Sequence, residues 1–175
     1  MSKKVFMSIV ILLCVISVSF SIPASGIFGE DVIEKIRPAE TDLPAGFVYG
    51  TVPEGAKTIF KANPWKMDQS AITRLTKEIY PDGNYQSVKA IHISIITRKD
   101  RPFGDDLVCY IFVFKNNDAA NREIKKLEQY ALFNKDRQIL QTKKNLAVVL
   151  MIDDVDDYSY IHEMSNVIKQ KLDTL

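Results

Sequence analysis

The stretch from Leu107 to Phe114, LVCYIFVF, constrains the fold of this chain more than any other part. It contains no charge and is rich in β-branched and aromatic residues, which favours a strand over a helix. Both of its alternating faces are apolar, a pattern typical of an interior strand that is covered on both sides. The sequence therefore predicts a sheet that has Leu107–Phe114 in its interior.

A second strand is predicted from Val88 to Thr97, and a charged loop joins it to the first as an antiparallel hairpin. A loop centred near Arg101 and Pro102 sorts the hairpin side chains into two faces, and a slip of one residue would exchange the partners. The first face is bulky and comprises Ile91, Ile93, Ile95, Val108, Tyr110, Phe112 and Phe114. The second face is smaller and comprises Ala90, His92, Ser94, Ile96, Leu107, Cys109, Ile111 and Val113.

The remaining elements follow from periodicity and turn residues. A short strand is expected at 47–52, helices at 68–79, 118–131 and 157–172, and a second hairpin at 137–142 and 146–152, with Asn145 as a left-handed turn residue. The order is β-α-β-β-α-β-β-α, which predicts an α+β fold whose antiparallel sheet has helices packed mainly on one face. Its core resembles the ferredoxin-like arrangement. That resemblance implies no function, because such folds host many.

The N-terminus has the pattern of a signal peptide over residues 1–26. Lys3 and Lys4 are followed by an apolar run from Val5 to Phe20 and by the small residues Ala24-Ser25-Gly26. We expect cleavage near Gly26 and export to the periplasm or the extracellular space. The alternative is an uncleaved N-terminal membrane anchor, although the run is shorter than the roughly 20 residues of a typical span. After cleavage no membrane span is expected.

Cleavage would leave 149 of the 175 residues, a length that favours one domain. We expect an irregular segment with a short strand at 27–66 and a compact α+β body at 67–175. Residues 1–26 hold two of the 23 basic residues, so 21 remain against 22 acidic ones. The resulting net charge of −1 argues against a nucleic-acid partner, which would require an excess of basic residues.

Cys109 is the one cysteine outside the signal segment, so the mature chain cannot form an intramolecular disulfide. It lies inside the apolar strand with no basic neighbour to lower its pKa. The sequence therefore predicts a buried structural thiol rather than a reactive one.

The second hairpin face supplies the candidate binding site. Its apolar surface is too large to stay bare in water, so the 27–66 segment, the last helix or a second protomer must cover it. His92, Ser94 and Cys109 on this face, beneath an aromatic segment that includes Trp65, suggest a pocket for a small apolar ligand. The alternative interpretation is that His92 is a satisfied histidine on a covered face.

No metal, cofactor or catalytic motif is predicted. The carboxylates of 153–157 lack the glycine and glutamate spacing of a calcium loop and suit the start of the last helix instead. His162-Glu163 lacks the second histidine of a zinc-protease motif, because Asn166 occupies that position. The sequence also lacks a nucleophile elbow, a phosphate-binding glycine loop and a Cys-x-x-Cys pair.

These observations favour an exported, non-enzymatic binding or interaction module for a small apolar ligand or a protein partner. One alternative is a small hydrolase that uses His92 or His162 as its general base. The other is a self-associating structural protein that buries its second sheet face in a homodimer.

Overall fold

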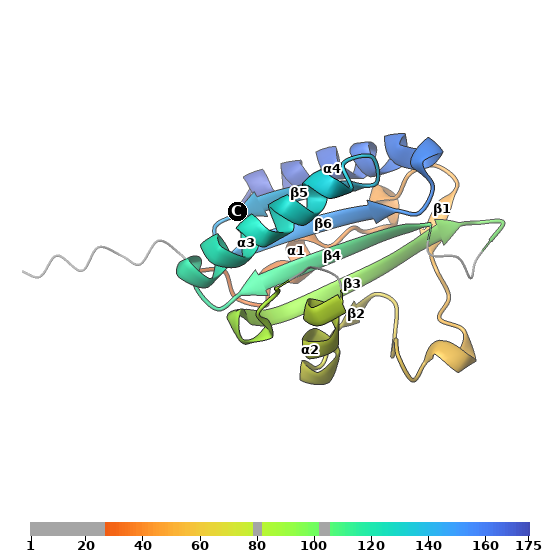
Figure 1. Cartoon of the computed structure of the whole chain (residues 1–175). Coiled ribbons are helices and arrows are strands. Elements are labelled where there is room, and N and C mark those ends of the chain that lie inside the picture. Colours follow the sequence, from red (N-terminus) through yellow and green to blue (C-terminus); the bar gives the residue numbers. More distant parts are fainter. Residues whose placement is uncertain (1–26, 79–81, 102–105) are drawn as a thin grey trace, which may run out of the picture.

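A computed structural model describes residues 27–78, 82–101 and 106–175 of the chain (Figure 1). The predicted signal segment lies outside the described residues. Those residues form a six-stranded antiparallel sheet in the order β1-β3-β4-β6-β5, with β2 also paired to β3. The strands are β1 (Phe47–Tyr49), β2 (Trp65–Lys66), β3 (Val88–Arg98), β4 (Leu107–Phe114), β5 (Gln138–Lys143) and β6 (Leu146–Ile152). The α-helices are α1 (Val32–Ile36), α2 (Gln69–Glu78), α3 (Asn117–Phe133) and α4 (Tyr158–Asp173).

Strand β4 lies in the interior of the sheet, between β3 and β6, as its apolar sequence predicts. The register of the β3–β4 hairpin places Ser94 opposite Cys109 and His92 opposite Ile111. This is the register expected for a loop centred near Arg101, so the division of the hairpin into a first and a second face is confirmed.

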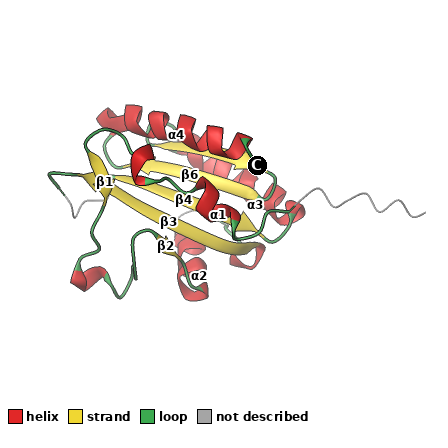
Figure 2. Cartoon of the chain, turned by 180° about the vertical axis from the view of Figure 1, so that it is seen from behind, coloured by secondary structure: helices red, strands yellow, loops and turns green. Residues whose placement is uncertain are grey.

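Helices cover both faces of the sheet, as the opposite views of Figures 1 and 2 show. Helices α2 and α3 pack against the bulky first face. Helices α1 and α4 pack against the second face, where α4 contributes Ile161, Met164, Ile168 and Leu172. The α+β class and the antiparallel sheet are confirmed, but the expectation of helices mainly on one face needs correction. The second face is buried like the first, because α4 and the N-terminal segment cover it.

The ferredoxin-like strand order is not confirmed. A split βαβ arrangement places a further strand between the two strands that flank each helix. Here β1 and β3, which precede and follow α2, pair directly and antiparallel. The strands that flank α3 are β4 and β5, and the strand between them is β6, which follows them in the chain, rather than β1, the first strand of the unit. Strand adjacency in this sheet therefore differs from that analogy.

Local side chains fix the ends of the helices and turns. Asp68 accepts a hydrogen bond from the Ala71 N–H at 2.9 Å and caps α2. Asn116 caps α3 in the same way, through the Ala119 N–H at 2.8 Å. In the β5–β6 turn the positive φ of 53° belongs to Lys144, so the prediction of a left-handed Asn145 was wrong.

No helix in the described part of the chain has the length and apolarity needed to span a membrane.

Candidate functional site

The outer edge of β3 has two partners and a side-chain bridge between them. β1 pairs with residues 96–98 and β2 with residues 92–93. Between these two stretches, the Ile95 N–H donates to Asn63 Oδ1 at 2.9 Å. Asn63 Nδ2 donates to the carbonyl oxygens of Ile95 and Gly50, each at 2.6 Å. The Asn63 amide therefore takes the place of a backbone peptide group in the ladder.

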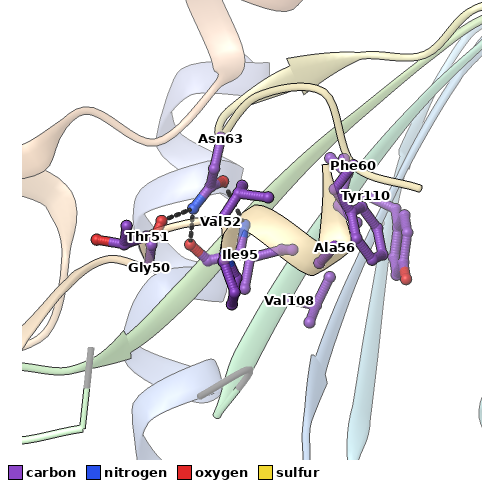
Figure 3. A pocket seen from close by; sticks show the side chains of 11 residues that line it. Gly50, Thr51, Val52, Ala56, Phe60, Asn63, Ile95, Val108 and Tyr110 are labelled. Atoms are coloured by element: carbon purple, nitrogen blue, oxygen red, sulfur yellow. Dashed lines mark hydrogen bonds between the residues drawn. The ribbon is translucent and has the colours of Figure 1, made fainter. Parts of the chain in front are cut away.

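This bridge holds the segment from Gly50 to Asn63 over the first face of the sheet and leaves a pocket of about 280 Å³ beneath it (Figure 3). Strands β3 and β4 form the floor with Ile93, Ile95, Val108 and Tyr110. The segment forms the roof with Val52, Pro53, Ala56 and Phe60. Gly50, Thr51 and Asn63 complete the lining.

Three of the polar lining residues, Gly50, Thr51 and Asn63, gather at one end of the pocket. The Asn63 amide already binds Gly50 and Ile95 (Figure 3), and the exposed Thr51 is the other polar side chain of the lining at this end. The rings of Phe60 and Tyr110 lie away from this end in Figure 3. An apolar cavity with one polar end suits a small, mainly apolar molecule that carries one hydrogen-bonding group.

The predicted site residues divide between the two faces of the sheet. His92, Ser94 and Cys109 share the second face as expected, and all three are buried. Trp65 lies on the first face, in the core cluster of α2 and α3. The four residues therefore do not form one site. Trp65 packs edge-to-face against Phe60, with ring centroids 6.3 Å apart, and so supports the roof of the pocket from behind.

Burial dominates the electrostatics of the second-face residues. It lowers the pKa of His92 from its ordinary 6.5 to about 4, although the Glu34 carboxylate on α1 opposes part of that shift. Burial also raises the pKa of the Cys109 thiol to about 12. Within the described residues, His92 Nδ1 and Ser94 Oγ are buried without a hydrogen-bond partner. A neutral imidazole and a protonated thiol here have the character of core groups.

Other charged candidates are engaged or dispersed. At the end of β3, Arg98 forms an ion pair with Asp157, and in the loop that follows, Arg101 forms one with Asp106. His162 is exposed on α4, away from the described pocket lining. The described ranges contain no group of three or more histidine, cysteine or acidic residues that could hold a metal ion.

The expectation that the 27–66 segment could cover the second face is correct for its first half, where Phe47 and Tyr49 pack on that face. It is wrong for its second half, because Phe60 and Trp65 pack on the first face. The face is decided by Asn63 and by the two residues of β2, which attach the segment to the β3 edge. A single asparagine beside a two-residue strand leaves no periodic pattern to detect. The Asn63-Pro64-Trp65 run is the one local signal at this position.

We expect Asn63→Ala to lower the free energy of unfolding by about 2 kcal/mol, because the Ile95 N–H loses its acceptor and the Gly50 and Ile95 carbonyls each lose a donor. Urea unfolding would measure the change, and hydrogen exchange at the Ile95 amide should accelerate. Thr58→Ala, an exposed position in the same segment, is the matched control and should leave both quantities unchanged. An Ile95 amide equally protected in both variants would contradict the bridging role of Asn63.

The site is thus a small apolar pocket on the first face, with a buried polar cluster on the opposite face. Its chemistry has to be interpreted from these residues alone. No known protein family matches the chain, and comparison with curated proteins and with solved structures gives no match.

Proposed function

We propose that the protein is an exported, non-enzymatic binding module that holds a small, mainly apolar ligand in the pocket beneath Gly50–Asn63. The observation that carries this proposal is the apolar cavity that the Asn63 bridge holds open above the sheet. Ile95 and Val108 in its floor are only half-buried, although most of the first face is covered. A ligand would remove this apolar surface from water, at about 25 cal/mol per Å².

The roof of the pocket is attached to the sheet at both of its ends. The Gly50 N–H donates to the Ile95 carbonyl at 3.0 Å, and the Met67 N–H to the Ile91 carbonyl at 2.9 Å. Between these points the chain makes a short 3₁₀ turn at Glu54–Ala56, where Ala56 faces the pocket. Because the roof is attached at two ends, we expect the cavity to be pre-formed and not to collapse when it is empty. Small-molecule sites in proteins are usually pre-formed in this way.

The proposal includes export because residues 1–26 have the features of a signal peptide. The buried, unreactive Cys109 suits an oxidising compartment, because an accessible free thiol there would be open to oxidation.

The two alternative functions have less support. A hydrolase would need its general base within hydrogen-bond reach of a substrate. His92 is buried on the sheet face opposite the pocket, and His162 lies on the surface of α4. Self-association through the second sheet face would require that face to be open, whereas α1 and α4 pack against it.

Filling the pocket is the direct test. We expect the neutral fluorophore N-phenyl-1-naphthylamine to bind the wild-type protein saturably. Val108→Trp should weaken that binding at least about tenfold, because an indole ring would occupy the cavity above the floor.

Two controls make this test specific. Val108→Ile adds only one methylene at the same position and should change the affinity less than about threefold. His92→Leu alters the opposite face and should have no effect on binding. Equal affinity in the wild type and Val108→Trp would refute the assignment of the pocket.

A further inference from the structure

The sheet ends at β5, whose outer edge has no partner strand in the described part of the chain. The Ile152 N–H donates to the Arg137 carbonyl at 2.9 Å, and this fixes which groups of β5 point toward β6. Because hydrogen-bonded and non-hydrogen-bonded pairs alternate in antiparallel strands, the backbone groups of Gln138, Leu140 and Thr142 point outward. A second strand could bind these donors and acceptors.

An open groove of about 550 Å³ runs beside this edge. Its walls come from the C-terminal half of α3, which packs beside β5, and from Tyr158 at the start of α4. Leu132, which lines the groove, is 72% exposed, and the adjacent Phe133 is 88% exposed. These are the most exposed large hydrophobic residues of the described chain. Exposed apolar side chains beside an open groove are typical of an interaction surface.

The edge lacks the devices that keep most edge strands from pairing. Charged side chains, prolines and bulges usually protect such an edge, yet residues 138–142 read QILQT, and the one charged residue of β5, Lys143 at its end, donates to the Leu172 carbonyl. The Gln138 side chain, which also lines the groove, is only 5% exposed, and its Oε1 has no hydrogen-bond partner among the described residues. Both the backbone and one side chain therefore have unused hydrogen-bonding capacity here.

The charges of the groove are self-complementary. Glu128 and Lys135 both line it, and both are exposed. Helix α3 leads through a short turn into β5, which runs back along it (Figure 1). Lys135 therefore lies near the Gln138 end of the groove, and Glu128 lies toward the Thr142 end. A two-fold rotation that reverses the groove would exchange these ends and bring each carboxylate to a lysine.

We propose that this face binds a second copy of the chain, with β5 paired antiparallel to the partner's β5 about a two-fold axis at Leu140. Gln138 then pairs with the partner's Thr142, so the outward-pointing residues of both copies meet each other. The same axis places Glu128 beside the partner's Lys135 and packs Leu132 into the shared groove. Such isologous pairing is the commonest way in which protein dimers form, and one sheet would run through both copies.

Sedimentation equilibrium of the purified protein over a range of concentrations tests the dimer. We expect a reversible monomer–dimer equilibrium in the wild type. Glu128→Lys and Lys135→Glu should each weaken association at least about tenfold, because each creates two like-charge contacts. The double variant Glu128→Lys with Lys135→Glu restores opposite charges and should return to within about threefold of the wild type.

A substitution in the strand tests the backbone pairing separately. Thr142→Pro removes an outward-pointing N–H that β6 does not use, and proline is tolerated on edge strands; it should weaken association. Thr142→Val keeps that N–H and is the matched control. A wild type that stays monomeric up to about 1 mM, beyond the range of a specific weak dimer, overturns the proposal. The proposal is also overturned if a dimer forms but its affinity is the same in both charge reversals and in the double variant as in the wild type. Either result would leave the β5 edge free to pair with a strand of another protein.

Discussion

Acidification from pH 6.5 to pH 4 should remove about 3 kcal/mol of the free energy of unfolding through His92 alone. His92 is buried on the second face of the sheet, and burial lowers its pKa from 6.5 to about 4 in the folded protein. Between these two values the unfolded chain binds a proton that the folded chain does not. The contribution of the neutral imidazole is therefore complete above pH 6.5 and is lost as the pH falls toward 4.

Urea unfolding of the wild type and of His92→Leu across this range measures the effect. Acidic groups titrate in both proteins, so the difference between their free energies of unfolding isolates the histidine. We expect that difference to grow in favour of the leucine variant as the pH falls. His162→Leu, which replaces the exposed histidine, is the control and should follow the wild type. Parallel curves for the wild type and His92→Leu would show that His92 titrates normally in the folded protein.

Replacement of Asn145 by alanine should lower the free energy of unfolding by about 4 kcal/mol. The side chain is fully buried and makes three hydrogen bonds. Its Oδ1 accepts from the Phe28 N–H at 2.8 Å, and its Nδ2 donates to the Phe28 and Phe114 carbonyls at 3.1 and 2.9 Å. Alanine would leave all three backbone groups without this partner and would release the start of the described chain from the β5–β6 turn.

Chemical denaturation gives the size of this effect, and hydrogen exchange at the Phe28 amide gives its location. Asn145→Asp keeps the acceptor for the Phe28 N–H but directs a carboxylate at two carbonyl oxygens, so it should be destabilised to a similar degree. Lys144→Asn, at the exposed neighbour with positive φ, should cost less than about 1 kcal/mol because asparagine tolerates that conformation. A cost below about 1 kcal/mol for Asn145→Ala would show that water replaces its hydrogen bonds.

The sequence predicts the parts of this fold that depend on local patterns. The β3–β4 hairpin, its register and its two faces follow from period-two alternation around one loop. Helices α2 and α3 follow from their apolar periodicity, and the structure shows that Asp68 and Asn116 cap them. The strand order does not follow, because adjacency depends on pairing between distant residues. The helices on both faces were missed for a related reason, since a hairpin with two apolar faces does not specify which element covers each.

In the candidate site, too, the sequence predicts what depends on local alternation and misses what depends on pairing between distant residues. Alternation placed His92, Ser94 and Cys109 together on one face, and the burial of Cys109 is confirmed. The position of Trp65 could not be predicted, because β2 is two residues long and its partner on β3 decides which face its side chain joins. Turn propensity predicted a left-handed backbone at Asn145, but this residue stabilises the fold through buried side-chain hydrogen bonds instead.

The proposed ligand site lies on the first face of the sheet, beneath Gly50–Asn63. Methyl NMR during a titration with N-phenyl-1-naphthylamine tests it most directly, because methyl groups lie on both faces. We predict saturable shifts for Val52, Ile95 and Val108 in the pocket, and none for Ile33 and Ile111 on the second face. Shifts confined to the second-face methyls, or no saturable shift at all, would contradict the proposal.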